Sequence, residues 1–394
     1  MTQIICDGFT VTGIASGIKK NGELDLGLIY SDSPANVAGV FTRNSVKAAP
    51  VLLTQKRIES GMAQAIIANS GNANCCNGSR GDADAAAMTH CVAQALGISD
   101  AAVLGASTGV IGEPLPVHKI ETAMPELKRS LNPRGWEDFA RAIMTTDKVP
   151  KLISRQEIFR GRPFTITAAA KGAGMIRPDM ATMLCFICTD AGATASCLDA
   201  MLRSAVDRSF NRITIDGDTS TNDTVLMMAN GRSGVAMDEP AAVDFFQAVL
   251  DEMLVDLARQ LVRDGEGVTK VVEIAVQNAV SPTDAAAIAD TVAHSLLVKT
   301  ALFGADANWG RIIGAAGRSK AHFDPRCVDI YFNDVKMVED GQGCGKLAES
   351  EATQVLKQRE FTITLDLKAG DASCSLLTCD LSLDYVRINA DYRS

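Results

Sequence analysis

The sequence predicts a mixed fold of the α/β or α+β class, with layers of sheet and helix in two domains. Short apolar runs typical of strands alternate with helical patterns along the whole chain. At about 100–200 residues per domain, 394 residues suffice for two or three domains. Aromatic residues make up 5% of the chain, which contains 32 glycines. We therefore expect an aliphatic core of small residues, crossed by many turns.

The N-terminal third is expected to contain short strands followed by a helix. The Asn-Gly pair at 21–22 indicates a hairpin turn. Helical spacing of apolar residues over 82–96, with Gly97 next, indicates a helix that ends in a glycine cap. An apolar run over 101–104 leads into the glycine-rich sequence 105–109, for which we expect a turn. The expected strands cover residues 9–14, 24–30, 39–41 and 65–68.

Two long helices are expected in the second half of the chain. The first begins at the Asp-Glu-Pro sequence 238–240, reaches Arg263 and stops at Gly265. The second begins at the Ser-Pro pair 281–282 and reaches Lys299. The other expected elements are a helix over 196–208, opened by a capping box of Ser196 and Asp199, and strands over 153–159, 164–169, 183–188, 328–332, 361–367 and 373–377.

Composition and charge exclude several classes of partner. The chain carries 38 Lys and Arg against 47 Asp and Glu, a net charge of −9, so we expect neither nucleic acid nor an anionic membrane as a partner. No apolar run approaches the ~18 residues of a spanning helix, and the start lacks the pattern of a secretory signal. The 11 cysteines are odd in number and scattered without a spacing pattern, which argues against a framework of disulfide bonds and favours a reducing compartment. We therefore expect a cytoplasmic protein.

One motif suggests a serine nucleophile. Residues 105–109, Gly-Ala-Ser-Thr-Gly, match the nucleophile elbow, with Ser107 as the nucleophile. The helix that should follow is disfavoured, because two prolines and a glycine occur within residues 110–116. A plain turn is the favoured interpretation, and a serine hydrolase remains the alternative. Candidate bases for such a serine are His118, His294 and His322.

Other motifs resemble ligand sites but fail in spacing, so we expect neither a metal nor a tightly bound cofactor. The polar run 216–223 lacks the Gly and Glu that a calcium loop needs, and is expected to be a structured interior loop. The two cysteines in 185–188 would point to opposite faces of a strand and are expected to be buried thiols. The glycines of 341–345 lack the βαβ context of a dinucleotide site. In 171–174, the lysine precedes the glycines, unlike in a P-loop.

Several stretches, in order along nearly the whole chain, carry a resemblance to one family. The most diagnostic is the Met-Ala-Thr-Met-Leu sequence 180–184, which ends the run from Lys171. Together the stretches resemble the ornithine acetyltransferase (glutamate N-acetyltransferase) family of arginine biosynthesis. The others are 17–20, 69–74, 107–112, 209–214, 216–224, 264–267, 308–312 and 388–390.

The resemblance implies an enzyme that processes itself. Cleavage between Ala181 and Thr182 would give an α chain, 1–181, and a β chain, 182–394, in an N-terminal-nucleophile arrangement. The new α-amine of Thr182, with an ordinary pKa of ~7.7–8.0, could serve as base for its own hydroxyl. The family reaction is a ping-pong transfer of acetyl from N2-acetylornithine to glutamate through an acetyl-threonine. Thr108 and the Gly109 N–H would stabilise the oxyanion.

The same resemblance implies a set of substrate-binding residues. We expect Lys171 to bind a carboxylate and Glu266 to bind the ornithine ammonium. Thr146 fits the family position of Thr145 nearly as well. The full set is Thr145, Lys171, Thr182, Glu266, Asn389 and Ser394.

Two questions stay open at this stage. Acetyl-CoA could serve as a second acetyl donor, which would make the enzyme bifunctional as an amino-acid N-acetyltransferase. An amidase or aminopeptidase with the same N-terminal nucleophile is the remaining enzymatic alternative. The expected assembly is a heterotetramer of two αβ pairs.

Overall fold

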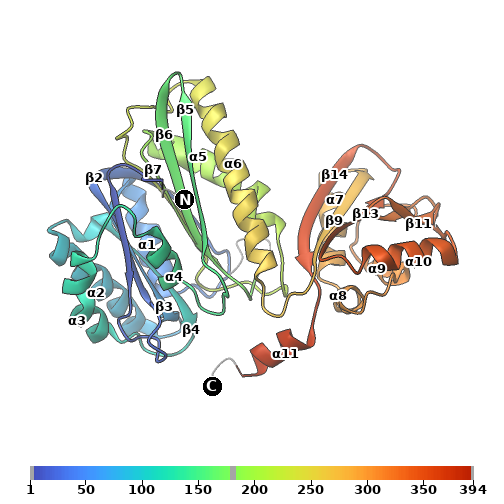
Figure 1. The fold of residues 1–394 in the computed structure, drawn as a ribbon, viewed down its shortest axis with the longest axis horizontal. Coiled ribbons are helices and arrows are strands. Elements are labelled where there is room, and N and C mark those ends of the chain that lie inside the picture. The colour runs from blue at the N-terminus through green and yellow to red at the C-terminus, as the bar shows by residue number, and fades with distance from the viewer. Residues whose placement is uncertain (1–3, 178–182, 392–394) are drawn as a thin grey trace. The chain divides into compact units, whose positions relative to one another are not determined.

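The structure is a computed structural model that describes residues 4–177 and 183–391 (Figure 1). The chain forms two compact units. Unit 1 comprises Met1–Asn211 and Asp218–Leu261, and unit 2 comprises Arg212–Gly217 and Val262–Ser394. Arg177 and Met183, the described residues on either side of the expected cleavage point, both belong to unit 1, so the expected chain boundary is not the boundary between the units.

The described residues of unit 1 form one eight-stranded sheet, with strand order β4-β3-β2-β8-β7-β6-β5 and β1 paired to β2. β3 pairs with β4 and β7 with β8 in parallel, while the other neighbours are antiparallel. The strands are β1 (Phe9–Ile14), β2 (Leu26–Phe41), β3 (Met62–Asn72), β4 (Val103–Val110), β5 (Lys151–Phe159), β6 (Arg162–Lys171), β7 (Leu184–Thr189) and β8 (Thr224–Ala229).

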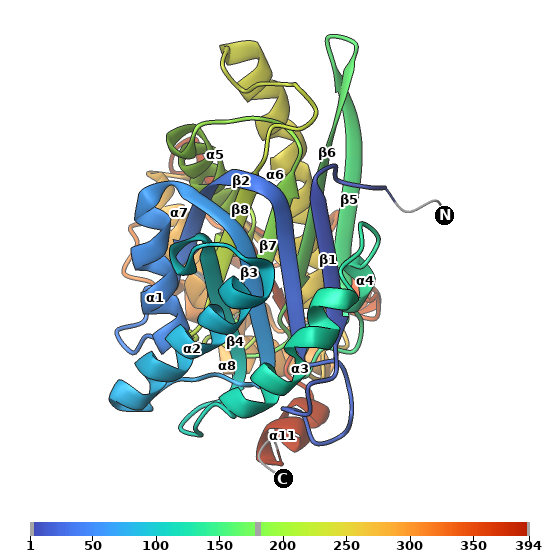
Figure 2. The same ribbon diagram turned by 90° about the vertical axis from the view of Figure 1, so that its left-hand side faces the viewer.

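Helices pack against both faces of this sheet. Successive residues of β2 point to opposite faces and join two different apolar clusters. Leu28 belongs to the cluster formed with α2 and α3, and Ile29 to the cluster formed with α4. Figure 2 shows α1, α2 and α3 in front of β3 and β4. The helices of unit 1 are α1 (Ala49–Arg57), α2 (Gly78–Leu96), α3 (Val117–Arg129), α4 (Trp136–Ala142), α5 (Ala195–Arg208) and α6 (Pro240–Arg263), which runs into unit 2.

The described residues of unit 2 form a six-stranded sheet of order β12-β11-β10-β13-β9-β14. α7 packs on β9 and β14 and contributes Ile288 and Val292 to the core of this unit. The strands are β9 (Val271–Ala279), β10 (Asp329–Phe332), β11 (Val335–Glu339), β12 (Gln342–Gly343), β13 (Glu360–Asp366) and β14 (Ala372–Cys379). The helices are α7 (Pro282–Ala293), α8 (Leu296–Phe303), α9 (Trp309–Gly317), α10 (Lys346–Val355) and α11 (Leu383–Ala390).

Most elements expected from periodicity are confirmed, and the fold is of the mixed α/β class. α2 contains the expected helix and ends at Gly97, whose φ of 70° gives the left-handed cap. α6 begins at Pro240 and ends at Arg263 as expected. The cysteines of 185–188 lie buried in β7, and residues 220–223 of the polar run are also buried.

The expectation of a turn over 105–109 is wrong. These residues lie within β4, which pairs in parallel with β3. A Cβ on Gly105 would lie 3.0 Å from Thr89 Cγ2 and 3.2 Å from Met88 Cε, both in α2. The glycine therefore allows a helix to pack closely on the strand, and it does not mark a turn.

Two expected helix boundaries are also wrong. The cap of α5 is Thr194, whose hydroxyl accepts the N–H of Cys197, so Ser196 and Asp199 form no capping box. The helix expected over 282–299 is two helices, because Ser295 begins α8 as a new N-cap that accepts the N–H of Val298.

The strands expected at 24–30 and 39–41 are one strand, β2, with a register shift between Tyr30 and Ala35. β1 and β2 do form an antiparallel hairpin, but residues 15–25 connect them, so the Asn-Gly pair lies in a longer loop.

Within the described ranges, no single helix is both long and apolar enough to cross a membrane, although α7 and α8, bent by 58°, pass together by length and composition.

Candidate active site

The end of β4 holds the pair predicted to stabilise an oxyanion. Thr108 is buried, and Gly109 has a φ of 131°. A Cβ on Gly109 would lie 2.4 Å from the carbonyl carbon of Gly71 and 2.5 Å from the backbone nitrogen of Asn72. Because both contacts are with backbone of β3, the position accepts only glycine without a shift of the strands. The backbone at the predicted oxyanion site is therefore tightly fixed.

A buried ammonium group joins two of the predicted hydroxyls. Lys171, the last residue of β6, lies with its Nζ 2.7 Å from Thr145 Oγ1 and 3.2 Å from Thr108 Oγ1. Both hydroxyls accept from Lys171, so each still has its own hydrogen to donate. Lys171 also pairs with Leu184 in β7, two residues after Thr182 in sequence. The structure thus brings Thr108, Thr145 and Lys171 together, and the contact is made by Thr145.

Asp147 is the buried counter-ion of this cluster. Its Oδ1 accepts from Lys151 Nζ at 2.6 Å and from the Gly172 N–H at 2.7 Å, and its Oδ2 accepts from the Thr145 N–H at 3.1 Å. Burial alone raises the pKa of this carboxyl, but the charges of Lys171 and Lys151 and the hydrogen bonds outweigh burial and lower the pKa to about 2. Asp147 therefore stays ionised and fixes the backbone at Thr145.

A second buried carboxyl holds the start of β7. Asp223 Oδ1 accepts the N–H of Met183 at 3.0 Å, and the Met183 carbonyl accepts the N–H of Thr224 at 3.1 Å. Burial raises the pKa of Asp223 well above its usual range, with the charge of Lys171 acting in the opposite direction. Its Oδ2 has no hydrogen-bond partner among the described residues. Because Met183 follows Thr182 directly, Asp223 anchors the peptide next to the predicted nucleophile.

Sequence reasoning missed both of these aspartates. Asp147 follows Thr145 and Thr146, and Asp223 ends the polar run 216–223, so each resembles an ordinary turn residue. The available signal was Lys151, four residues after Asp147, but that spacing alone is common on protein surfaces.

In unit 2, the structure brings together two of the predicted substrate-binding residues. Glu266 is buried, and its Oε2 accepts from Asn389 Nδ2 at 2.8 Å. Asn389 lies on α11, and the adjacent Gly267 has a φ of 68°. A Cβ on Gly267 would lie 2.3 Å from the backbone nitrogen of Tyr385, so the glycine allows the loop to contact α11 closely.

Three residues of the predicted site, Ala181, Thr182 and Ser394, lie outside the described residues.

Comparison with known proteins identifies the family. The family model described as "ArgJ family" matches residues 10–394. The chain belongs to the ArgJ family. Its ArgJ relatives include the "Arginine biosynthesis bifunctional protein ArgJ" of Geobacter sulfurreducens, 50% identical over 98% of this chain and 99% of the relative. The protein of the same description from Syntrophotalea carbinolica is 49% identical, with the same two coverages.

Solved structures of the ArgJ family are similar over part of the chain. The crystal structure of ArgJ from Bacillus halodurans is 40% identical and covers 52% of this chain and 97% of that chain, with a TM-score of 0.49. The ornithine acetyltransferase from Mycobacterium tuberculosis, complexed with ornithine, is also 40% identical. It covers 45% of this chain and 95% of that chain, with a TM-score of 0.42.

The structure of this ArgJ-family chain does not support Ser107 as a nucleophile. Its hydroxyl donates to Asn69 Oδ1 at 2.6 Å, and its carbonyl accepts from Asn222 Nδ2 at 2.8 Å. No described histidine forms a hydrogen bond with it. Ser107 lies inside β4 and is absent from the residues with positive φ, whereas an elbow nucleophile occupies a strained turn. Ser107 therefore has a structural role in the strand.

No group of three or more His, Cys, Asp or Glu side chains in the described ranges of the ArgJ-family chain is arranged to hold a metal ion. Burial raises the pKa of the Cys185 and Cys188 thiols, which keeps both protonated and unreactive.

Replacing Gly109 with alanine is expected to destabilise the ArgJ-family fold by about 3 kcal/mol, because the new methyl group meets β3 backbone and φ is unfavourable. Gly112→Ala is the matched control: its φ is 85°, but nothing lies within 4 Å of the place that its new methyl group would occupy. Urea unfolding of both variants measures the difference. Equal midpoints would show that the close approach of β3 and β4 is not what requires Gly109.

Proposed function

We propose that this chain is an acetyltransferase of arginine biosynthesis that moves acetyl from N2-acetylornithine to glutamate. Thr182 is the nucleophile, released by self-cleavage between Ala181 and Thr182. The observation that carries the proposal is the Lys171 cluster. The Lys171 ammonium group donates hydrogen bonds to the Thr108 and Thr145 hydroxyls. Lys171 also pairs across the sheet with Leu184 of β7, which is two residues after Thr182 in the sequence.

The chemistry follows from this arrangement. The Thr182 hydroxyl attacks the acetyl carbonyl, and the α-amine of Thr182 takes its proton. The carbon–nitrogen bond breaks, the proton passes to the departing ornithine amine, and an acetyl ester remains on Thr182. Glutamate then takes the acetyl group by the reverse steps. Charge on the carbonyl oxygen is stabilised by the Thr108 hydroxyl and the Gly109 N–H.

The Thr108 hydroxyl is prepared for this task. Lys171 donates a hydrogen bond to the Thr108 oxygen, so the hydroxyl hydrogen of Thr108 can be donated to another acceptor. The nearby positive charge of Lys171 makes the Thr108 hydroxyl a stronger hydrogen-bond donor. A neighbouring ammonium group also stabilises negative charge that develops on the acetyl oxygen. Lys171 thus supports the oxyanion site in addition to attracting a substrate carboxylate.

Substrate recognition uses opposite charges. Lys171 attracts the α-carboxylate, with Thr145 as a neighbouring hydrogen-bond donor. The buried carboxylate of Glu266, oriented by Asn389, binds the ornithine ammonium. Ser394 completes the proposed set. We further propose acetyl-CoA as a second acetyl donor, a heterotetramer of two αβ pairs, and a cytoplasmic location.

Intact-mass analysis and one transfer assay test the proposal. We expect two chains, the second beginning at Thr182, and production of ornithine and N-acetylglutamate from N2-acetylornithine and glutamate. Acetate as the sole acetyl product would favour the amidase alternative. A fully active, uncut chain of 394 residues would contradict the proposed nucleophile.

A further inference from the structure

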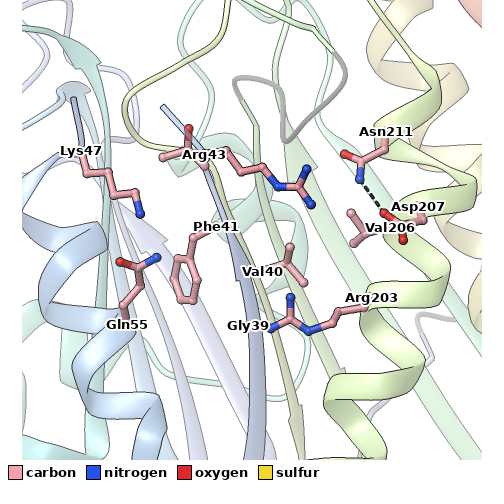
Figure 3. A pocket seen from close by; sticks show the side chains of 11 residues that line it. Gly39, Val40, Phe41, Arg43, Lys47, Gln55, Arg203, Val206, Asp207 and Asn211 are labelled. Carbon is pink, nitrogen blue, oxygen red and sulfur yellow. Dashed lines mark hydrogen bonds between the residues drawn. The ribbon is translucent and has the colours of Figure 1, made fainter. Parts of the chain in front are cut away.

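A cavity in unit 1 is lined by basic side chains. Its volume is about 360 Å³, within the range of small-molecule sites, and it lies between the end of β2, the segment that leads to α1, and the C-terminal part of α5 (Figure 3). Among the described lining residues, Arg43, Lys47 and Arg203 are cationic and Asp207 is the acidic one. This excess of positive charge occurs in a chain whose net charge is −9.

The cations come from two parts of the chain: Arg43 and Lys47 lie on the segment between β2 and α1, and Arg203 lies on α5. In Figure 3, the guanidinium groups of Arg43 and Arg203 lie on either side of Val40, and Lys47 lies apart from both, on the side of Phe41 and Gln55. Arg203 also pairs with Asp199, with a nitrogen–oxygen distance of 2.8 Å, and this carboxylate offsets part of the positive charge of Arg203. The cavity therefore combines positive charge with an apolar and aromatic wall.

Hydrogen bonds fix the segment that carries Arg43 and Lys47. Thr42 Oγ1 donates to the Ser220 carbonyl at 2.7 Å, and Asn44 Nδ2 donates to the Thr219 carbonyl at 3.1 Å. Asn44 Oδ1 accepts the N–H of Val46 at 2.9 Å. A segment held in this way loses little conformational entropy when a ligand binds between its cations.

The chemistry of the cavity favours a phosphate-bearing ligand. Guanidinium and ammonium groups together suit phosphate oxygens, and an aromatic ring beside aliphatic groups suits a heterocycle. N2-acetylornithine fits poorly, because its single carboxylate is accompanied by an ammonium group that the basic lining repels. The cavity is therefore unsuited to the amino-acid donor and suited to a nucleotide.

The cavity wall is connected to the start of β7. Thr42 lines the cavity, and its N–H donates to the Asp223 carbonyl at 3.0 Å. Asp223 in turn accepts the N–H of Met183, the residue after Thr182. One residue, Asp223, thus separates the cavity wall from the peptide that follows the proposed nucleophile. A ligand with a long arm could place its phosphates in the cavity and its acyl group at Thr182.

We propose that this basic cavity binds the nucleotide phosphates of acetyl-CoA and is the docking site of the second acetyl donor. The inference rests on the proposed function. The Thr182 hydroxyl attacks the thioester carbonyl, the carbon–sulfur bond breaks, and the proton held by the α-amine passes to the departing thiolate. The products are acetyl-Thr182 and free coenzyme A, and no other reactant is needed.

The test compares two acetyl donors in the same enzyme preparations. For Lys47→Gln and for the double variant Arg43→Gln/Lys47→Gln, we expect kcat/KM with acetyl-CoA to fall about 10- to 100-fold, mainly through KM. Transfer from N2-acetylornithine should change less than about twofold. Arg129→Gln, a charge-matched change at the end of α3, is the control and should affect neither donor.

Three further probes identify the group that is recognised. Acetyl-3′-dephospho-CoA should be a poorer donor than acetyl-CoA for the wild type, and the double variant should lose this preference. Acetyl phosphate should be unaffected by the substitutions, because it lacks the nucleotide. Inorganic phosphate should compete with acetyl-CoA and not with N2-acetylornithine. If acetyl phosphate and acetyl-CoA lose activity equally, the cavity is a simple phosphate site and the nucleotide assignment is wrong.

The outcomes separate this inference from the proposed function. Transfer from N2-acetylornithine without any from acetyl-CoA would overturn the inference alone, as would an equal loss of both donors in the variants. If neither donor is active, the proposed function fails. Calorimetric titration with coenzyme A then still decides whether the wild type binds it and the double variant does not.

Discussion

Replacing Thr182 with alanine is expected to abolish both chain cleavage and acetyl transfer. The proposed mechanism makes its hydroxyl the nucleophile of both reactions, and loss of a catalytic nucleophile typically lowers turnover by at least about 10⁴-fold. Intact-mass analysis should find one uncut chain. Incubation with N2-acetylornithine should leave no acetylated protein, whereas the wild type should gain one acetyl group on the chain that begins at Thr182.

Two companion variants make this result specific. Thr182→Ser keeps a hydroxyl and should retain cleavage and part of the activity. Ser107→Ala should retain most of the activity, because the Ser107 hydroxyl is bonded to Asn69 inside β4. Loss of activity in Ser107→Ala together with normal activity in Thr182→Ala would reverse the assignment in favour of the serine hydrolase.

Replacing Asp147 with asparagine is expected to cost about 3–5 kcal/mol of folding free energy, the usual cost of breaking a buried ion pair. The side chains of Asp147 and Lys151 are 0% exposed and 2.6 Å apart. Asparagine preserves shape and acceptor oxygen but removes the negative charge that Asp147 places beside the buried ammonium groups of Lys151 and Lys171. Urea unfolding at pH 7 measures the loss.

The pH dependence of the same variant tests the cause. The pKa of Asp147 is lowered to about 2 in the folded chain, below the ~3.9 of an unfolded aspartate. Its ionised form therefore contributes about 2 kcal/mol that is present above pH ~4 and is lost as the pH falls from ~4 toward 2. The difference in stability between wild type and Asp147→Asn should shrink over that interval.

Asp324 provides a matched control for the burial of Asp147. Hydrogen bonds from Arg326 lower the pKa of Asp324 to about 2 as well, but the side chain of Asp324 is 41% exposed. Asp324→Asn should leave the urea midpoint nearly unchanged, because solvent screens a surface pair. A loss as large as that of Asp147→Asn would mean that the lowered pKa, and not burial, determines the cost.

The sequence predicts best the elements whose signals are local. α6 begins with Pro240 and ends just before Gly265, and both boundaries are visible in the sequence. The helix α4 escapes notice because it has only 7 residues, too few to show a period. β4 escapes because Gly105 and Gly109 are poor strand formers. Their places depend on α2 and β3, which come from other parts of the chain.

The residues of the candidate site were likewise predictable from the sequence only in part. Family resemblance located Thr108, Thr145 and Lys171, and the structure brings these three side chains together. The family resemblance did not point to Asp147 or Asp223. The burial that makes each carboxyl important arises only when segments distant in sequence fold together.

The strand order of unit 1 constrains when cleavage can occur. β7 and β8, which follow residue 182, lie between β2 and β6, which precede residue 181. Strands made by one proposed fragment are thus inserted into the middle of the sheet made by the other. A fragment 1–181 expressed alone would expose the unpaired edges of β2 and β6 and be prone to aggregate. The proposed cleavage is therefore expected to follow folding. Once denatured, an enzyme cut at the proposed bond would have to recover by a bimolecular encounter, so the proposed maturation would in practice be a one-way event.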